Sequence, residues 1–145
     1  MKVQDGMGLT YNVTVELFDR DGVLKDKREI HNAVHTNAKN GSADQLLAAP
    51  ALGKPTHCAV DTGTHTAPAA LGTELDRNAF TSKTRSGNVV TMVTDWAAGD
   101  ATGALTEAGI FDAAAAGNVW LSVTFAVVNK TAGDTLKITW TLTFN

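Results

Sequence analysis

The sequence predicts an all-β fold, a β-sandwich or jelly-roll-like single domain with one short helix. Apolar and polar residues alternate along several runs of the chain, which is the period of a strand with one buried face. Residues typical of turns, mainly Gly, Asn and Asp, separate these runs at short intervals. The length of 145 residues suits one domain with its own core.

The clearest strands lie near the C-terminal end, over residues 119–127 and 136–144. Apolar residues take every second position in both runs: Val119, Leu121, Val123, Phe125 and Val127, then Leu136, Ile138, Trp140, Leu142 and Phe144. Between the runs, Gly133 and Asp134 are typical of a hairpin loop. We therefore expect the two strands to pair as a long β-hairpin that anchors the core.

The N-terminal part predicts a second strand pair. Residues 1–8 are polar and rich in glycine, and we interpret them as an N-terminal arm outside a β-sandwich domain of residues 9–145. Alternation over 9–18 predicts a strand, and an aspartate-rich turn ending in glycine follows at 19–22. Residues 23–30 are charged and rich in lysine, as is typical of edge strands, where lysine discourages stray pairing.

One helix is expected after these strands. Residues 31–37 are interpreted as a connector, and the alanines, leucines and glutamine of 38–49 favour a helix that ends at Pro50. Residues 56–60 have the composition of a short buried strand. The Thr-, Ala- and Gly-rich residues 61–76 are predicted to form a long surface loop.

The remaining segments complete the predicted sandwich. Residues 78–86 and 88–96 are expected to pair as a hairpin around a Ser-Gly-Asn turn. A Gly-, Ala- and Asp-rich loop follows at 97–106, then a short strand at 107–112 and a small turn at 113–118. With seven or eight short strands in all, a sandwich or jelly roll is the architecture that fits.

The charge and the apolar content of the sequence argue against nucleic acid and membranes as partners. Charged residues make up 19% of the chain and the formal net charge is −3. Nucleic-acid binding usually needs a concentrated basic face, which the sequence lacks, so we expect no direct contact with nucleic acid. No apolar run approaches the ~20 residues that span a bilayer, so we expect no membrane contact. The single Cys58 excludes an intrachain disulfide, and no signal peptide is recognisable, which fits synthesis in a reducing cytoplasm.

Enzymatic motifs are weak in this sequence. Asp61-Thr62-Gly63 is the tripeptide of aspartic proteases, whose chemistry needs two such carboxylates sharing a proton. Only one copy is present, so a turn after a strand is the simpler interpretation. His57 and Cys58 are adjacent and would point to opposite faces of a strand. We therefore expect no catalytic residues and no enzyme activity.

Metal and cofactor signatures are weak as well. The histidines at 31, 35, 57 and 65 occur without a cysteine pair or an H-E-x-x-H motif. Asp19 and Asp21 begin like a calcium loop, but the later ligands are missing, which favours a hairpin turn. The glycines lack the lysine and the strand–helix context of a phosphate loop. We expect no metal site and no cofactor.

The three tryptophans carry two open interpretations. Trp96, Trp120 and Trp140 could form a platform for sugars or nucleobases, but two of them lie in the strongest strands. Core packing or a subunit contact is the better account, because aromatic side chains favour both settings. Trp96 and Trp120 are the candidate interface residues, since interface cores favour tryptophan.

Several blocks, in this order, resemble a family of small virion proteins of tailed bacteriophages. The blocks are residues 30–34, 46–47, 55–64, 71–77, 105–112 and 134–140. Similar Gly-Thr-Gly and Glu-Ala/Ile-Gly-Leu/Ile-Phe blocks occur in phage head-surface proteins and in the collar regions of tail fibres. The family-motif residues here are Asp61, Thr62, Gly63, Glu107, Ala108, Gly109, Ile110 and Phe111. The family commonly has glycine at the place of Asp61, so this loop is expected to differ.

The resemblance implies a structural role in a phage particle. A self-contained domain of this size is similar to head decoration, or cement, proteins. These bind as homodimers or homotrimers over junctions of the major capsid protein and stabilise the head. The expected location is thus the head surface of the virion, after synthesis in the host cytoplasm. A tail collar, baseplate or fibre-adaptor protein is the alternative, and a host-surface or carbohydrate-binding β module is a second one.

Overall fold

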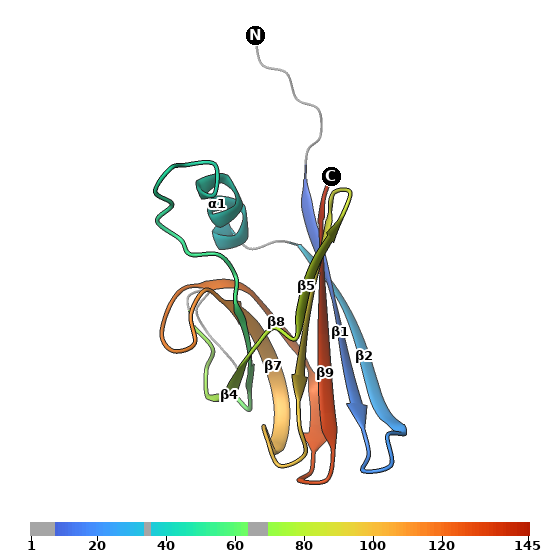
Figure 1. The fold of residues 1–145 in the computed structure, drawn as a ribbon. Coiled ribbons are helices and arrows are strands. Elements are labelled where there is room, and N and C mark those ends of the chain that lie inside the picture. Colours follow the sequence, from blue (N-terminus) through green and yellow to red (C-terminus); the bar gives the residue numbers. More distant parts are fainter. Residues whose placement is uncertain (1–7, 34–35, 64–69) are drawn as a thin grey trace.

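The computed structural model describes residues 8–33, 36–63 and 70–145. The fold is all-β as predicted: two antiparallel sheets form a sandwich, and one short helix stands beside one end of it (Figure 1). The elements are β1 (Leu9–Phe18), β2 (Leu24–Ala33), α1 (Thr36–Asp44), β3 (His57–Asp61), β4 (Glu74–Ala79), β5 (Ser82–Ser86), β6 (Val89–Trp96), β7 (Gly103–Phe111), β8 (Val119–Lys130) and β9 (Thr135–Phe144).

The five-stranded sheet has the order β2-β1-β9-β6-β5. The predicted N-terminal hairpin is confirmed, because β1 and β2 pair directly and β2 lies at the sheet edge. In the turn between them, the Asp19 carboxylate accepts the backbone N–H groups of Asp21 and Val23, both at 2.9 Å. Gly22 takes a φ of 79°, a left-handed conformation that costs glycine little.

The four-stranded sheet has the order β4-β3-β7-β8. Its central strands β3 and β7 show little alternation of apolar and polar residues, because both of their faces are buried. Cys58 and Ile110 are buried on one face, and Ala59 and Phe111 are buried on the other. One face packs on the five-stranded sheet. The other is covered partly by Leu71, from the chain that precedes β4.

The predicted C-terminal hairpin is wrong. β8 is an edge of the four-stranded sheet and β9 is the middle of the five-stranded sheet, so the chain crosses the sandwich between Lys130 and Thr135. Alternation correctly indicates both strands, but it does not say which strand is the neighbour. In β8 it also gives the wrong buried face beyond Val123, because the pairing with β7 is irregular there, and Val128 is buried while Val127 is 46% exposed. The crossing is fixed by Lys130, which is 2% exposed and donates to the carbonyl oxygens of Ala97 (3.1 Å) and Asp134 (2.7 Å).

The second predicted hairpin is confirmed in its later part only. β5 and β6 pair around the expected turn, with Arg85 opposite Val90. Asn78 and Ala79, expected in the same strand as β5, end β4 in the other sheet. The chain changes sheets at residues 80–81, where the Phe80 N–H donates to the Thr56 carbonyl at 3.1 Å. Residues 78–86 are mostly polar and do not alternate, so the sequence does not indicate that the strand is interrupted between Ala79 and Ser82.

Several element bounds differ from those expected. β2 continues to Ala33, inside the expected connector, and β7 begins at Gly103, inside the expected loop. α1 covers Thr36–Asp44 and not 38–49. The chain turns at the end of α1 because the Asp44 carboxylate accepts the N–H of Leu52 at 2.7 Å. Of the long loop 61–76, residues 64–69 lie outside the described residues, and β4 begins at Glu74.

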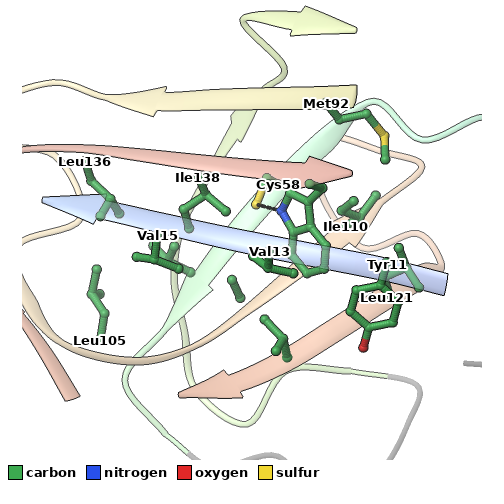
Figure 2. Close-up of a cluster of buried hydrophobic side chains, with 14 of the residues drawn as sticks. Tyr11, Val13, Val15, Cys58, Met92, Leu105, Ile110, Leu121, Leu136 and Ile138 are labelled. Atoms are coloured by element: carbon green, nitrogen blue, oxygen red, sulfur yellow. Dashed lines mark hydrogen bonds between the residues drawn. The ribbon is translucent and has the colours of Figure 1, made fainter. Parts of the chain in front are cut away.

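The core lies between the two sheets, and Figure 2 shows side chains from both of them in it. Trp140 of β9 is fully buried, and its Nε1 donates to Cys58 Sγ of β3 at 3.4 Å. The Tyr11 ring lies 5.9 Å from the Trp140 ring, and its hydroxyl donates to the Ser122 carbonyl of β8 at 3.0 Å. Both aromatic polar groups thus connect one sheet to the other.

The two ends of the described chain lie together. Gly8 exchanges backbone hydrogen bonds with Asn145, at 3.0 and 2.6 Å. The rest of the expected N-terminal arm, residues 1–7, lies outside the described residues. Within the described ranges, no helix has the length and apolar character needed to cross a membrane.

Candidate functional site

The family-motif residues meet on two adjacent strands. Asp61 is the last residue of β3, and its register partner on β7 is Glu107. Both side chains are fully buried. Two blocks that are far apart in the sequence therefore form one contiguous part of the four-stranded sheet. Ala108 and Ile110 of the second block face the sandwich core.

The Asp61 carboxylate is engaged by the backbone around it. One oxygen accepts the N–H of Gly63 and the other accepts the N–H of Thr73. The Thr62 N–H donates to the Thr73 carbonyl at 3.2 Å, and the Thr106 hydroxyl donates to the Gly63 carbonyl. This carboxylate closes a turn, which is the simpler of the two interpretations of Asp61-Thr62-Gly63. The same contacts give aspartate a structural role at position 61.

The two motif glycines are required by close packing. A Cβ on Gly63 would lie 2.8 Å from Thr73 Oγ1, and a Cβ on Gly109 would lie 3.1 Å from Leu71 Cδ2 and 3.2 Å from the Leu121 carbonyl oxygen. Real Cβ atoms rarely come so near to other atoms. The motif thus specifies how the chain before β4 lies over the sheet.

Phe111 of the motif contacts a cation, although its own side chain is only 3% exposed. The Arg77 guanidinium lies 3.6 Å from the centre of its ring. Glu74 holds that guanidinium through contacts of 2.6 and 2.8 Å, and the carbonyl oxygens of Ala113 and Ala116 accept from it at 2.9 and 2.8 Å. The Arg77 guanidinium is therefore bonded within the chain, by the Glu74 carboxylate and by two backbone carbonyl groups.

Trp96 and Trp120, the candidate interface residues, are core residues. Trp96 is 0% exposed and Trp120 is 4% exposed. The Trp120 Nε1 donates to the Gly53 carbonyl at 3.0 Å, and its ring lies against Gly41 of α1. Side chains so buried have almost no area to offer another subunit. Core packing, the other interpretation of these tryptophans, is the one that the burial supports.

The two described histidines, His31 and His57, lie apart. His31 contacts Asn12 Oδ1 at 2.6 Å and His57 contacts Thr56 Oγ1 at 2.8 Å, on different sheets. The histidines at 35 and 65 lie outside the described residues. In the part of the chain that the structure describes, no three His, Cys, Asp or Glu residues are placed to hold a metal ion. Burial raises the pKa of the Cys58 thiol to about 12, which makes it a poor nucleophile.

A polar hollow of about 710 Å³ lies at the end of the sandwich that holds the β1–β2 turn. One oppositely charged pair in it, Lys25 and Asp134, is closed within the chain. Lys25 donates to both oxygens of Asp134, at 3.0 and 2.9 Å, and the Thr131 N–H and hydroxyl also donate to that carboxylate, both at 2.9 Å. The Lys25 and Thr131 hydrogen bonds hold the pKa of Asp134 at about 2. These contacts stabilise the turns and leave little for a ligand.

A different hollow combines apolar surface with free cations. Between α1 and the adjacent end of the five-stranded sheet lie two adjoining cavities of about 420 and 230 Å³, which share the lining residues Ser42 and Phe144 and which we treat together as one groove. We call it the α1 groove. Its other lining residues are Gly8, Leu9, Lys39, Gln45, Lys54, Pro55, Lys83, Val90, Met92, Trp120, Leu142 and Asn145. Sequence reasoning missed it, because these residues come from seven separate segments.

Comparisons with known proteins do not place the chain in a family: no family model, no curated protein and no solved structure matches it.

Proposed function

We propose that this chain is a structural protein of a tailed-bacteriophage particle, a decoration protein that binds over junctions of the major capsid protein and stabilises the head. The proposal starts from the sequence blocks that resemble such proteins. The observation that carries it furthest is the pairing of Asp61 with Glu107, which joins the two most distinctive blocks into one buried scaffold. A shared scaffold is what a family of binding modules with different surfaces would keep.

The exposed apolar side chains support an adhesive role. Leu46 and Leu47, which are adjacent in the turn after α1, are 88% and 59% exposed. At a separate place, Val127 on the edge strand β8 is 46% exposed. Grouped exposed apolar residues are a common mark of protein–protein contact. In the proposed assembly, such residues are covered by neighbouring copies in a homodimer or homotrimer, or by the shell.

A binding experiment with empty shells tests the proposal. Shells of the major capsid protein, assembled without this chain, are sedimented with increasing amounts of purified protein. A decoration protein saturates at a fixed ratio to shell subunits, because its sites repeat with the symmetry of the shell. Absence of cosedimentation contradicts the proposal. Binding to isolated tails, but not to shells, makes the tail collar or fibre-adaptor role the correct one.

A further inference from the structure

We propose that the α1 groove binds an extended peptide segment of a partner protein, one whose apolar side chains are flanked by carboxylates. The inference rests on the geometry and charge of the groove and not on the proposed virion role. If that role is correct, the shell protein is one source of such a segment.

The floor of the groove is apolar and is built by both sheets. Val90, Met92 and Leu142 come from adjacent strands of the five-stranded sheet, and Trp120 comes from the other sheet. Phe144 lies where the two cavities join and is 38% exposed. α1 packs on β8, and cavities of about 420 and 230 Å³ lie between the helix and this end of the five-stranded sheet. The groove therefore has room for apolar side chains between its walls.

The rim of the groove is cationic. Lys39, Lys54 and Lys83 line it, and among the described residues that line it there is no Asp or Glu. This is unusual in a chain with 15 acidic and 12 basic side chains. Lys83 donates to the Pro55 carbonyl at 2.8 Å, whereas Lys39 and Lys54 form no ion pair with any described residue. The charge that complements this rim is a set of carboxylates.

The helix wall supplies hydrogen-bonding groups suited to a peptide backbone. Ser42 lines both cavities, and its buried hydroxyl makes no hydrogen bond within the described part of the chain. One turn later, Gln45 uses its amide nitrogen to donate to the Leu52 carbonyl at 2.9 Å, which leaves its amide oxygen as an acceptor. A peptide offers both donors and acceptors to such groups. An acyl chain offers neither, so a lipid tail is the poorer match.

The wall opposite the sheet is held in place before any ligand arrives. The Gly53 carbonyl accepts from Trp120 at 3.0 Å, and the Gly53 N–H donates to Asp112 at 3.1 Å. Asp44 at the end of α1 fixes Leu52 from the other side. Because these contacts pre-form the site, binding costs little ordering of the protein.

Fluorescence polarisation with short labelled peptides tests the proposal. The probes are acetylated, amidated peptides in which glutamates alternate with leucine, phenylalanine or tryptophan, and the control peptides have lysine in place of glutamate. The full chain is compared with the variant Lys39→Glu/Lys54→Glu, with Ser42→Ala, and with Lys27→Glu. Lys27 is an exposed lysine of the edge strand β2, outside the groove. Amide shifts in NMR spectra locate the bound peptide.

The expected result is saturable binding of at least one acidic peptide, with amide shifts centred on Ser42, Val90 and Leu142. The double charge reversal weakens that binding by about tenfold or more, Ser42→Ala weakens it by about threefold, and Lys27→Glu leaves it unchanged. The proposal is overturned if no acidic peptide binds, if the lysine peptides bind equally well, or if Lys27→Glu and the double variant lose equal affinity. It is also overturned if the fatty acid dodecanoate, tested as a second ligand, shifts the groove amides and none of the peptides does. None of these results bears on shell binding, so the two proposals fail separately.

Discussion

The indole N–H of Trp140 donates to the Cys58 sulfur at 3.4 Å, across the interior of the sandwich. Trp140 belongs to the central strand of one sheet and Cys58 to a central strand of the other. A buried indole N–H is usually paired with an acceptor, and the thiol provides one without bringing a charge into the core. The only cysteine of the chain is thus a packing residue.

The Cys58 thiol is expected to be inert in the folded protein. It is fully buried, and desolvation raises its pKa to about 12, so almost no thiolate exists at mildly alkaline pH. A chromogenic disulfide reagent should therefore react with the native protein only at the rate of unfolding. The same reagent should react at once in guanidinium chloride. Fast reaction of the native protein contradicts the described burial.

Replacing Gly41 by alanine should destabilise the protein by about 1–3 kcal/mol. A Cβ at this position would lie 2.7 Å from two ring carbons of Trp120, which is buried and cannot retreat easily. Helix propensity alone predicts the opposite sign, a gain of about 1 kcal/mol. Asn40→Ala, at an exposed position of the same helix, is the matched control and should be neutral or slightly stabilising. Chemical denaturation measures both, and a stabilised Gly41→Ala would show that α1 does not press on Trp120.

The substitution Asp61→Asn should lower the free energy of unfolding by about 1–3 kcal/mol. The Asp61 carboxylate accepts two backbone N–H groups, one on each oxygen. An amide side chain can accept only one of them and turns its own NH₂ toward the other. Asp95→Asn is the control, because Asp95 is 45% exposed and its contact with Lys137 is long, at 3.9 Å. Equal denaturation midpoints for the two variants would remove the structural role given to Asp61.

The free energy of unfolding should fall as the pH decreases from about 4 to about 2, in part because of Asp134. The carboxyl titrates near its ordinary value of 3.8 when unfolded and near 2 when folded, because Lys25 and Thr131 bond its charged form. Between these values the unfolded state binds more protons, so acid favours unfolding. Asp134→Asn should be less stable at neutral pH and should lose that part of the pH dependence. An unchanged pH slope in Asp134→Asn would contradict this assignment.

Charge at positions 46 and 47 should disrupt self-association. Both leucines are well exposed, and we expect them to be covered in the proposed oligomer. Leu46→Glu/Leu47→Glu should shift the sedimentation coefficient toward that of the monomer while the circular dichroism spectrum stays unchanged. The control Val23→Glu alters a side chain that is 59% exposed in the β1–β2 turn. If the double variant and the unmodified protein sediment alike, the contact lies elsewhere.

The sequence predicts much of the fold because alternation is a local property. It indicates β1, β9 and most of β8, and the aspartate-rich turn before β2 is correctly assigned. It fails where the neighbour of a strand is decided by contacts far away in the sequence. β8 and β9 are separated by a turn of a kind that also joins hairpins, whereas their partners β7, β1 and β6 lie far away in the sequence. The buried Lys130, bonded to the Ala97 carbonyl, is one of the contacts at this crossing.

Less of the candidate site than of the fold could be predicted from local sequence patterns. The role of Asp61 as a turn residue could be predicted, since Asp before Thr-Gly commonly bonds the backbone two residues on. Its pairing with Glu107 depends on the order of strands in the sheet, which no local pattern contains. No pattern in the sequence indicates the α1 groove. Lys39, Lys54 and Lys83 are isolated lysines in the sequence and become a rim only when α1 and β5 are placed beside each other.

The most direct test of the virion role is the copy number of this chain in purified particles. Quantitative mass spectrometry, with labelled reference peptides for this chain and for the major capsid protein, gives the ratio of the two. The proposed role predicts one copy for each shell subunit or for every few of them, because decoration sites repeat over the whole head. About 3–18 copies per particle would place the chain in the tail, as the closed symmetry of tail rings dictates. Absence of the chain from particles would contradict the virion role altogether.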